Sequence, residues 1–110
     1  KGQDRSLVLW PMAEFEAAAT RIREASQSNA AVRAYSRVLF SSAFDQVPDR
    51  QGRITVPPTL RDYAGLDREC VVVGNHKTVE IWDDSAWEQY LATQDAAFAD
   101  IDEEVVPGLF

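Results

Sequence analysis

The sequence predicts an α+β fold in which one strand-helix unit occurs twice, with the first copy truncated at its front. The first observation is an internal repeat: residues 2–16 match residues 74–88 without a gap at an offset of 72 (74 minus 2). The second is that each copy runs from a short β-rich segment, residues 6–10 or 78–82, directly into a helix start. The aligned positions keep their chemistry: Gly2 with Gly74, Arg5 with Lys77, Ser6 with Thr78, Leu9 with Ile81, Trp10 with Trp82, Phe15 with Trp87 and Glu16 with Glu88.

Three longer helices are predicted from apolar residues at helical spacing. The first begins at Pro11, which suits the first helical position, and the last follows a capping-box pattern that starts at Ser85. Between them, a helix over residues 30–43 follows the turn-forming residues 26–29. The apolar faces are expected to contain Met12, Phe15, Ala19 and Ile22 in the first helix and Trp87, Leu91 and Phe98 in the last.

A hairpin, a short helix and a further strand are predicted between the second helix and the second repeat copy. These elements are a strand at 44–47, a turn at 48–52, a strand at 53–56, a short helix from Pro57 and Pro58 to Tyr63, and a buried strand at 69–74. The same plan places the first copy's counterpart of Asp49 before Lys1, so we expect a segment on the order of 30 residues ahead of Lys1 in the intact protein. The chain then divides into residues 1–43, the second half of a first unit plus a helical connection, and residues 44–110, a second unit with a C-terminal helix and an acidic tail.

Several conspicuous side chains have structural interpretations. Cys70 opens an apolar run and is expected to be buried. Trp10, Trp82 and Trp87 are expected to anchor the core, and His76 is expected to lie in a turn rather than to bind a metal.

Composition limits the functional classes. With 110 residues, 26% charged side chains and a net charge of −7, the chain has the properties of one globular domain without a transmembrane segment or a signal peptide. The single cysteine cannot form an internal disulfide, which favours the cytoplasm. No motif for catalysis, metal binding or phosphate cradling is present, so we expect no enzyme, no metal, no cofactor and no small-molecule substrate.

The segment from Asp49 to Pro57, with the sequence DRQGRITVP, contains the most informative motif. Gly52 can supply a positive φ, and Asp49 can accept hydrogen bonds from the amides of the turn. Arg53 then begins a strand with its guanidinium on a defined face, where it can bind phosphate oxygens or the edge of guanine. The alternative is a purely structural Asp49–Arg53 pair across a turn, worth about 0–1 kcal/mol if exposed.

This D-x-x-x-R segment, together with the repeated strand that ends in tryptophan before a helix, resembles the MraZ family of the AbrB/SpoVT superfamily of swapped-hairpin DNA-binding proteins. The resemblance covers nearly the whole chain, except that the first unit's own D-x-x-x-R loop is absent. It implies two AbrB-like units whose strands interleave into a small β-barrel and whose loops face one way. Arg53 would be the principal DNA contact with Arg50 and Arg61 beside it, while Asp49 and Gly52 would structure the loop.

The resemblance further implies a cytoplasmic, nucleoid-associated transcriptional regulator. Such a protein would act at the promoter of the division and cell wall gene cluster, and a ring-like homo-oligomer would present many loops to repeated operator boxes in double-stranded DNA. The alternative is an AbrB-fold protein interaction module, antitoxin-like or an assembly subunit, whose acidic C-terminal segment binds a basic partner.

The uneven distribution of charge bears on both hypotheses. Residues 80–110 hold nine acidic side chains and no lysine or arginine, whereas the preceding residues sum to +2. We therefore expect the Arg50/Arg53 loop to lie on a face away from the C-terminal helix and tail. The arginines of the first two helices have two interpretations, a solvated face or auxiliary phosphate contacts: Arg21, Arg23, Arg33 and Arg37.

Overall fold

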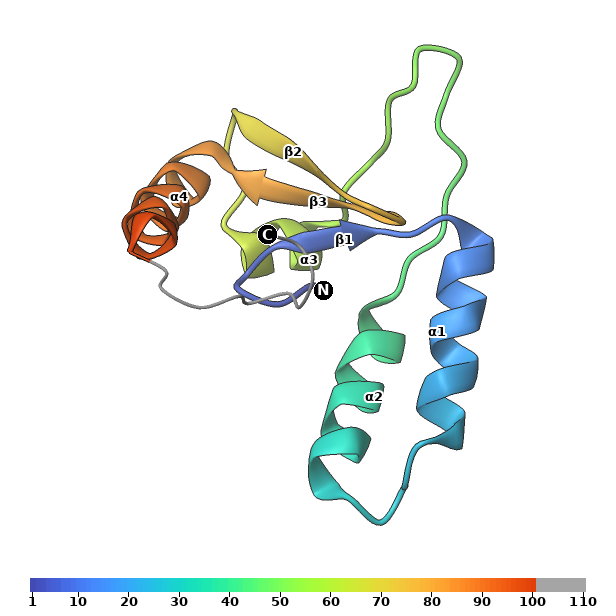
Figure 1. Ribbon diagram of the computed structural model, residues 1–110. Helices are drawn as coiled ribbons and strands as arrows, with labels where there is room; N and C mark the ends of the chain where they lie inside the picture. The colour runs from blue at the N-terminus through green and yellow to red at the C-terminus, as the bar shows by residue number, and fades with distance from the viewer. Residues whose placement is uncertain (101–110) are drawn as a thin grey trace.

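A computed structural model describes residues 1–100 and confirms the α+β class (Figure 1). Within these residues, no helix combines the length and apolarity that spanning a bilayer requires. The elements in chain order are β1 (Leu7–Leu9), α1 (Met12–Glu24), α2 (Ala30–Ser42), α3 (Pro58–Ala64), β2 (Cys70–Asn75), β3 (Thr78–Asp83) and α4 (Asp84–Ala99).

The three strands form one antiparallel sheet in the order β1-β3-β2, so β3, the strand of the second repeat copy, lies in the middle. Its register with β1 follows the repeat. Leu7 pairs with Ile81, Val8 with Glu80 and Leu9 with Val79. The repeat offset of 72 makes Leu7 equivalent to Val79 and Leu9 equivalent to Ile81, so the first and last pairs are equivalent to each other. The same offset makes Val8 equivalent to Glu80, so the middle pair is equivalent to itself. The two matching strands are thus paired symmetrically about Val8 and Glu80.

The core lies on one face of this sheet and is small. Leu7 and Ile81 from the two repeat strands are buried there with Ala64 of α3. Half-buried residues from α3 and from the chain on either side of it pack against these three: Ile54, Val56, Leu60, Tyr63 and Leu66. On the opposite face, Trp82 is buried beneath Trp87 and Tyr90 at the start of α4.

Helices α1 and α2 form a hairpin that extends away from the sheet (Figure 1). The two helices meet where the Phe15 and Phe40 rings make an edge contact with centroids 6.0 Å apart. Asn29 caps α2 by accepting a hydrogen bond of 2.8 Å from the Ala31 amide. The helix predicted at 30–43 is therefore confirmed with its end one residue earlier.

The strands predicted at 44–47 and 53–56 do not form, which corrects the sequence analysis. Both segments are extended and belong to a long loop that projects from the body (Figure 1), but neither has a ladder of backbone bonds. Instead, the Gln46 side chain bridges the loop: its Oε1 accepts from the Thr55 amide at 2.8 Å, and its Nε2 donates to the Thr55 carbonyl. An isolated pair of strands is marginal without a third strand beside it, and residues 1–100 provide none here.

Strand β2 is also not buried as predicted. It is an edge strand, and alternate side chains face solvent because α3 and α4 leave that part of the sheet open; Val72 is 67% exposed and Cys70 is exposed as well. His76 lies in the β2–β3 turn as predicted, with a φ of 59°.

Two details of the helices differ from expectation. The cap of α4 is Asp83 rather than Ser85, since the Asp83 carboxylate accepts from the Ala86 amide at 3.2 Å. The predicted apolar faces are only partly covered: Met12, Leu91 and Phe98 are 54%, 39% and 68% exposed. The spacing correctly identified these helix faces as apolar. Within residues 1–100, however, no other element packs over the whole of either face.

Candidate nucleic-acid interface

The tip of the projecting loop is organised around the Asp49 carboxylate. Its Oδ1 accepts hydrogen bonds from the backbone amides of Gln51 at 2.9 Å and Arg53 at 2.8 Å. Two backbone bonds close the same turn, from the Gly52 amide to the Asp49 carbonyl at 2.9 Å and from the Asp49 amide to the Arg53 carbonyl at 3.0 Å. The turn therefore stays ordered without a neighbouring strand.

The same carboxylate also orients the Arg53 side chain. Asp49 Oδ2 accepts from Arg53 Nε at 2.8 Å, while the Arg53 side chain remains 72% exposed. Arg53 donates through Nε, so its two terminal nitrogens project beyond the ion pair. A guanidinium held in this way presents two parallel donors, the geometry that suits phosphate oxygens or the O6 and N7 atoms of guanine.

Hydrogen bonding to the ionised form lowers the pKa of Asp49 below its ordinary value of 3.8. The hydrogen bond from the backbone amide of Arg53 is the largest cause of the lower pKa, and desolvation opposes it. The Arg53 side chain and the Gln51 amide lower the pKa further by smaller amounts. The carboxylate is therefore ionised throughout the neutral range, and the ion pair with Arg53 persists there.

Gly52 completes the turn with a φ of 77°, which a residue with a Cβ adopts only with strain. No atom lies within 4 Å of the position where a Cβ would stand, so the backbone conformation alone favours glycine. This is the positive φ that the sequence analysis required of Gly52.

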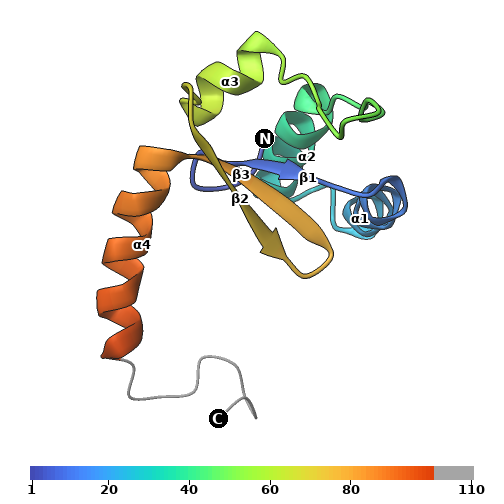
Figure 2. The ribbon, with the colours of Figure 1, turned by 90° about the horizontal axis from the view of Figure 1, so that it is seen from above.

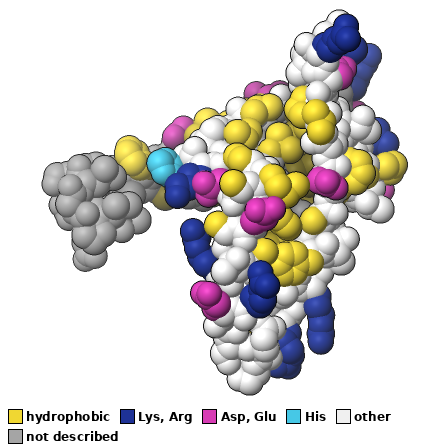
Figure 3. All heavy atoms as spheres, turned by 90° about the vertical axis from the view of Figure 1, so that its right-hand side faces the viewer, with side chains coloured by type: hydrophobic (Ala, Val, Ile, Leu, Met, Phe, Trp, Pro, Cys, Tyr) yellow, Lys and Arg dark blue, Asp and Glu magenta, His cyan; other side chains and the backbone are white. Residues whose placement is uncertain are grey.

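The three arginines named as DNA contacts do not gather at one point. Arg50 and Arg53 are both exposed at the loop tip, which Figure 3 shows as a projecting knob bearing Lys or Arg side chains beside one acidic group. Arg61 is exposed on α3, and α3 lies apart from the tip in both ribbon views (Figures 1 and 2). The structure thus brings together Arg50 and Arg53 only.

The other basic residues lie far from this tip. The α1–α2 hairpin extends in the opposite direction from the loop (Figure 1), and Arg33 Nη1 donates to the Gln27 carbonyl at 2.9 Å within that hairpin. Helix α4 lies at the other side of the sheet from the loop (Figures 1 and 2), as expected from the charge distribution. The acidic tail falls in residues 101–110, outside the described part of the chain.

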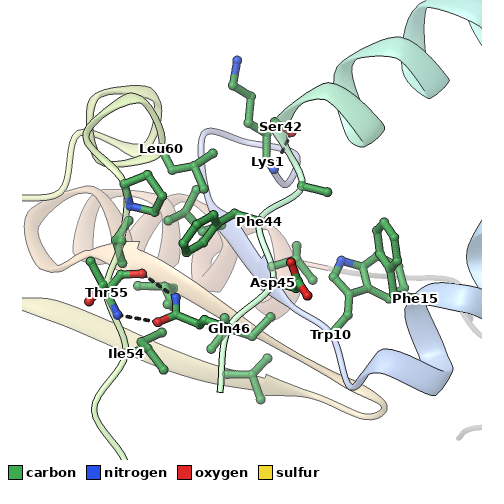
Figure 4. A pocket seen from close by; sticks show the side chains of 18 of the residues that line it. Lys1, Trp10, Phe15, Ser42, Phe44, Asp45, Gln46, Ile54, Thr55 and Leu60 are labelled. Atoms are coloured by element: carbon green, nitrogen blue, oxygen red, sulfur yellow. Dashed lines mark hydrogen bonds between the residues drawn. The ribbon is translucent and has the colours of Figure 1, made fainter. Parts of the chain in front are cut away.

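A hollow of about 590 Å³ lies beside the base of the loop and was not foreseen from the sequence (Figure 4). It is bounded by β1, by the two extended sides of the loop and by the ends of α1 and α2. In Figure 4, Phe44 lies near Leu60, and Trp10 and Phe15 lie together on the other side. No sequence signal indicated it, because Phe44, which is 56% exposed, belongs to a segment that was predicted to be a strand.

Comparison with known proteins identifies the family. Residues 39–107 match the family model of the MraZ protein, which its description calls antitoxin-like. The chain belongs to the MraZ family. It is 56% identical to the transcriptional regulator MraZ of Salinispora arenicola over 109 residues, which is 99% of this chain and 77% of the relative. The MraZ regulators of Parafrankia sp. and Thermobifida fusca are 57% and 50% identical over 99% of this chain and 76% of each relative.

The matched range of the MraZ model includes the whole projecting loop and both sides of the Gln46–Thr55 bridge. Within residues 1–100, no group of three or more His, Cys, Asp or Glu side chains is placed to hold a metal ion. The loop itself presents two exposed arginines to solvent, Arg50 and Arg53.

Proposed function

We propose that the chain is a transcriptional regulator that binds double-stranded DNA through the loop of residues 48–53. The observation that carries the proposal is the Asp49–Arg53 arrangement, in which one carboxylate holds the turn and the Arg53 Nε while the terminal nitrogens remain exposed. A projecting, pre-ordered guanidinium loses little conformational entropy on binding a groove. Arg50 adds a second positive charge at the tip, and Arg61 contacts the flanking backbone if the DNA extends as far as α3.

The symmetric β1–β3 register supports the further proposal that the chain contains two AbrB-like units, residues 1–43 and residues 44–110. Strands related by the repeat are paired about Val8 and Glu80, as expected when two copies of one unit share a sheet. In this arrangement the hollow beside the loop would receive strands of the other unit and so complete an interleaved barrel. Two arginine loops would then face one way.

We further propose that such chains assemble into a ring, which would favour the binding of repeated operator boxes. Each loop adds to the affinity of the others once one box is bound, because the remaining loops are held at high effective concentration. We further propose, from the family resemblance, that the regulator acts at the promoter of the division and cell wall gene cluster and is nucleoid-associated in the cytoplasm.

Replacement of Arg53 tests the DNA contact. We expect Arg53→Ala to weaken binding to promoter repeats by about 1–3 kcal/mol, or roughly five- to 150-fold, and to reduce the discrimination against scrambled boxes. Fluorescence anisotropy with both duplexes at several salt concentrations measures the affinity, the specificity and the salt dependence. Arg23→Ala is the matched control, because Arg23 is an exposed arginine on α1, far from the loop. Equal affinities for Arg53→Ala and the parent protein would refute the assignment.

A further inference from the structure

A tight turn of residues 49–52 forms the tip of the projecting loop. The Gly52 amide donates to the Asp49 carbonyl at 2.9 Å, so Arg50 and Gln51 occupy the two corner positions of this turn. Both corner residues are exposed. Their side chains are therefore among the first to meet any surface that the loop approaches.

The two corner residues differ in how firmly they are held. Asp49 Oδ1 accepts from the Gln51 amide at 2.9 Å, and the same oxygen accepts from the Arg53 amide at 2.8 Å. One carboxylate thus fixes the backbone from which both the Gln51 and the Arg53 side chains extend. Within residues 1–100, no hydrogen bond holds the Arg50 amide in this way. Contacts that discriminate between bases need a fixed geometry, so Gln51 is better placed for them than Arg50.

The Gln51 side chain offers a donor and an acceptor side by side. Its amide has no hydrogen-bond partner among residues 1–100, whereas those of Gln27 and Gln46 are bonded to the backbone. In the major groove, adenine presents the complementary pair, the N7 acceptor and the N6 donor. Guanine presents two acceptors there, O6 and N7, which suit the two parallel donors of a guanidinium.

We propose that Gln51 recognises an adenine one or two base pairs from the guanine that Arg53 contacts. The two residues are separated by at most about 7 Å of chain. Stacked base pairs are about 3.4 Å apart, so both side chains reach neighbouring steps of one groove. Arg50, whose backbone is not held, contacts a phosphate and adds affinity without sequence preference. This inference rests on the proposed DNA contact and deepens it by naming the second base that one loop recognises.

Selection from a randomised duplex library, followed by sequencing, tests the assignment with the full-length protein. We expect the parent to select a guanine and, one or two base pairs away, an adenine. Gln51→Ala should reduce the preference for that adenine by about five- to 150-fold and keep the preference for the guanine. Arg53→Ala should do the reverse, so each variant loses a different base.

A modified base tests the atomic contact. In 7-deazaadenine the N7 acceptor is replaced by carbon, which removes the partner of the Gln51 donor. Placed at the selected adenine, it should weaken the parent about two- to tenfold in an anisotropy titration, because one hydrogen bond is lost. The same duplex and the unmodified duplex should bind Gln51→Ala equally.

A change of preference provides a second variant. Gln51→Lys replaces the amide by a group that only donates, so we expect the selected base to change from adenine to guanine. Gln3→Ala is the matched control, because Gln3 is also an exposed glutamine in a turn, and it should select the parent's sequence. In Gln51→Ala, hydrogen exchange at the Thr55 amide should equal that of the parent, which shows that the loop is intact.

Several outcomes would overturn the assignment. They are a retained adenine preference in Gln51→Ala, an equal loss of affinity for all sequences in that variant, continued selection of adenine by Gln51→Lys, and an altered preference in Gln3→Ala. The proposed DNA contact fails by a different result, when Arg53→Ala binds like the parent. A parent that selects no sequence at all would overturn both.

Discussion

One carboxylate, that of Asp49, determines the conformation of the loop and the direction of its arginine. Its first oxygen satisfies two backbone amides of the turn and its second oxygen binds Arg53 Nε. An exposed ion pair alone contributes little to stability, because solvent screens the attraction. The backbone bonds therefore do more to hold the turn than the pairing of charges, and the ion pair chiefly sets the orientation of the Arg53 side chain.

The pKa of Asp49 gives a pH prediction at this scale. Because the folded loop lowers the pKa, the stabilisation by ionised Asp49 is fully present above 3.8, the ordinary value, and is lost as the pH falls through the lower folded value. Carboxyl-carbon NMR of Asp49 should therefore show a midpoint below 3.8. The Gln51 amide resonance should shift over the same pH range, since its hydrogen bond depends on that carboxylate.

The Arg53→Ala variant distinguishes the two kinds of bond to Asp49. The substitution removes the side-chain donor but keeps the backbone amide at position 53, which is the larger cause of the shift. The Asp49 pKa should therefore rise only part of the way to 3.8. A midpoint at 3.8 in this variant would show that the guanidinium, and not the backbone, controls the carboxylate.

At the scale of elements, the two sides of the loop of residues 44–57 are held together by side-chain hydrogen bonds. In most hairpins a ladder of backbone hydrogen bonds has this role. The Gln46 amide group makes both hydrogen bonds to the Thr55 backbone that a paired strand residue would make. The two sides of the loop are consequently joined at only two places, the Gln46–Thr55 bridge and the Asp49 turn. The bridge holds the loop at its base and the turn holds it at its tip.

Removal of the bridge should loosen the loop without unfolding the sheet. In Gln46→Ala we expect faster hydrogen exchange at the Thr55 amide, while exchange in the β2–β3 ladder is unchanged. The loss of two exposed hydrogen bonds should cost about 1–2 kcal/mol of local stability. Gln51→Ala is the control, since only the backbone amide of Gln51 takes part in the turn. Equal Thr55 protection in Gln46→Ala and the parent would contradict the bridge.

The elements show which structure a sequence can predict. The helix at Ala30–Ser42 and the turn at Gly52 follow from local signals, an asparagine cap and a residue free to adopt positive φ, and both were predicted. The exposure of Cys70 and the missing ladder at residues 53–56 depend on which elements lie alongside, which local patterns do not encode. The contact between Asp49 and Arg53 was predictable because four residues separate them. The hollow beside the loop was not predictable, because its walls come from β1 and from residues 44–57, which lie far apart in the sequence.

For the whole molecule, the position of a charge matters more than the total. The net charge is −7, yet the loop tip carries Arg50 and Arg53, and α4 with its carboxylates lies on the other side of the sheet. At physiological salt the screening length is about 8 Å, so charges on α4 have little influence at the tip. DNA at the loop is therefore exposed mainly to the local positive charge.

Two substitutions that change the net charge equally test this separation. Gln51→Glu and Gln89→Glu each bring the net charge from −7 to −8, the first at the loop tip and the second on α4. We expect Gln51→Glu to weaken DNA binding roughly tenfold and Gln89→Glu to leave it within about twofold. Anisotropy titrations at one salt concentration provide the comparison. Equal losses of affinity in the two variants would mean that the total charge, not its distribution, governs DNA binding.

The pairing of Val8 with Glu80 has a consequence for how this chain selects its partners. Two β3 strands from separate chains, paired in the equivalent register, would place Glu80 directly opposite a second Glu80, and facing like charges destabilise a sheet. Pairing β3 with β1 of its own chain puts a valine at that position instead. The difference between the two repeat copies at this one position thus disfavours the pairing of two β3 strands from separate molecules in this register.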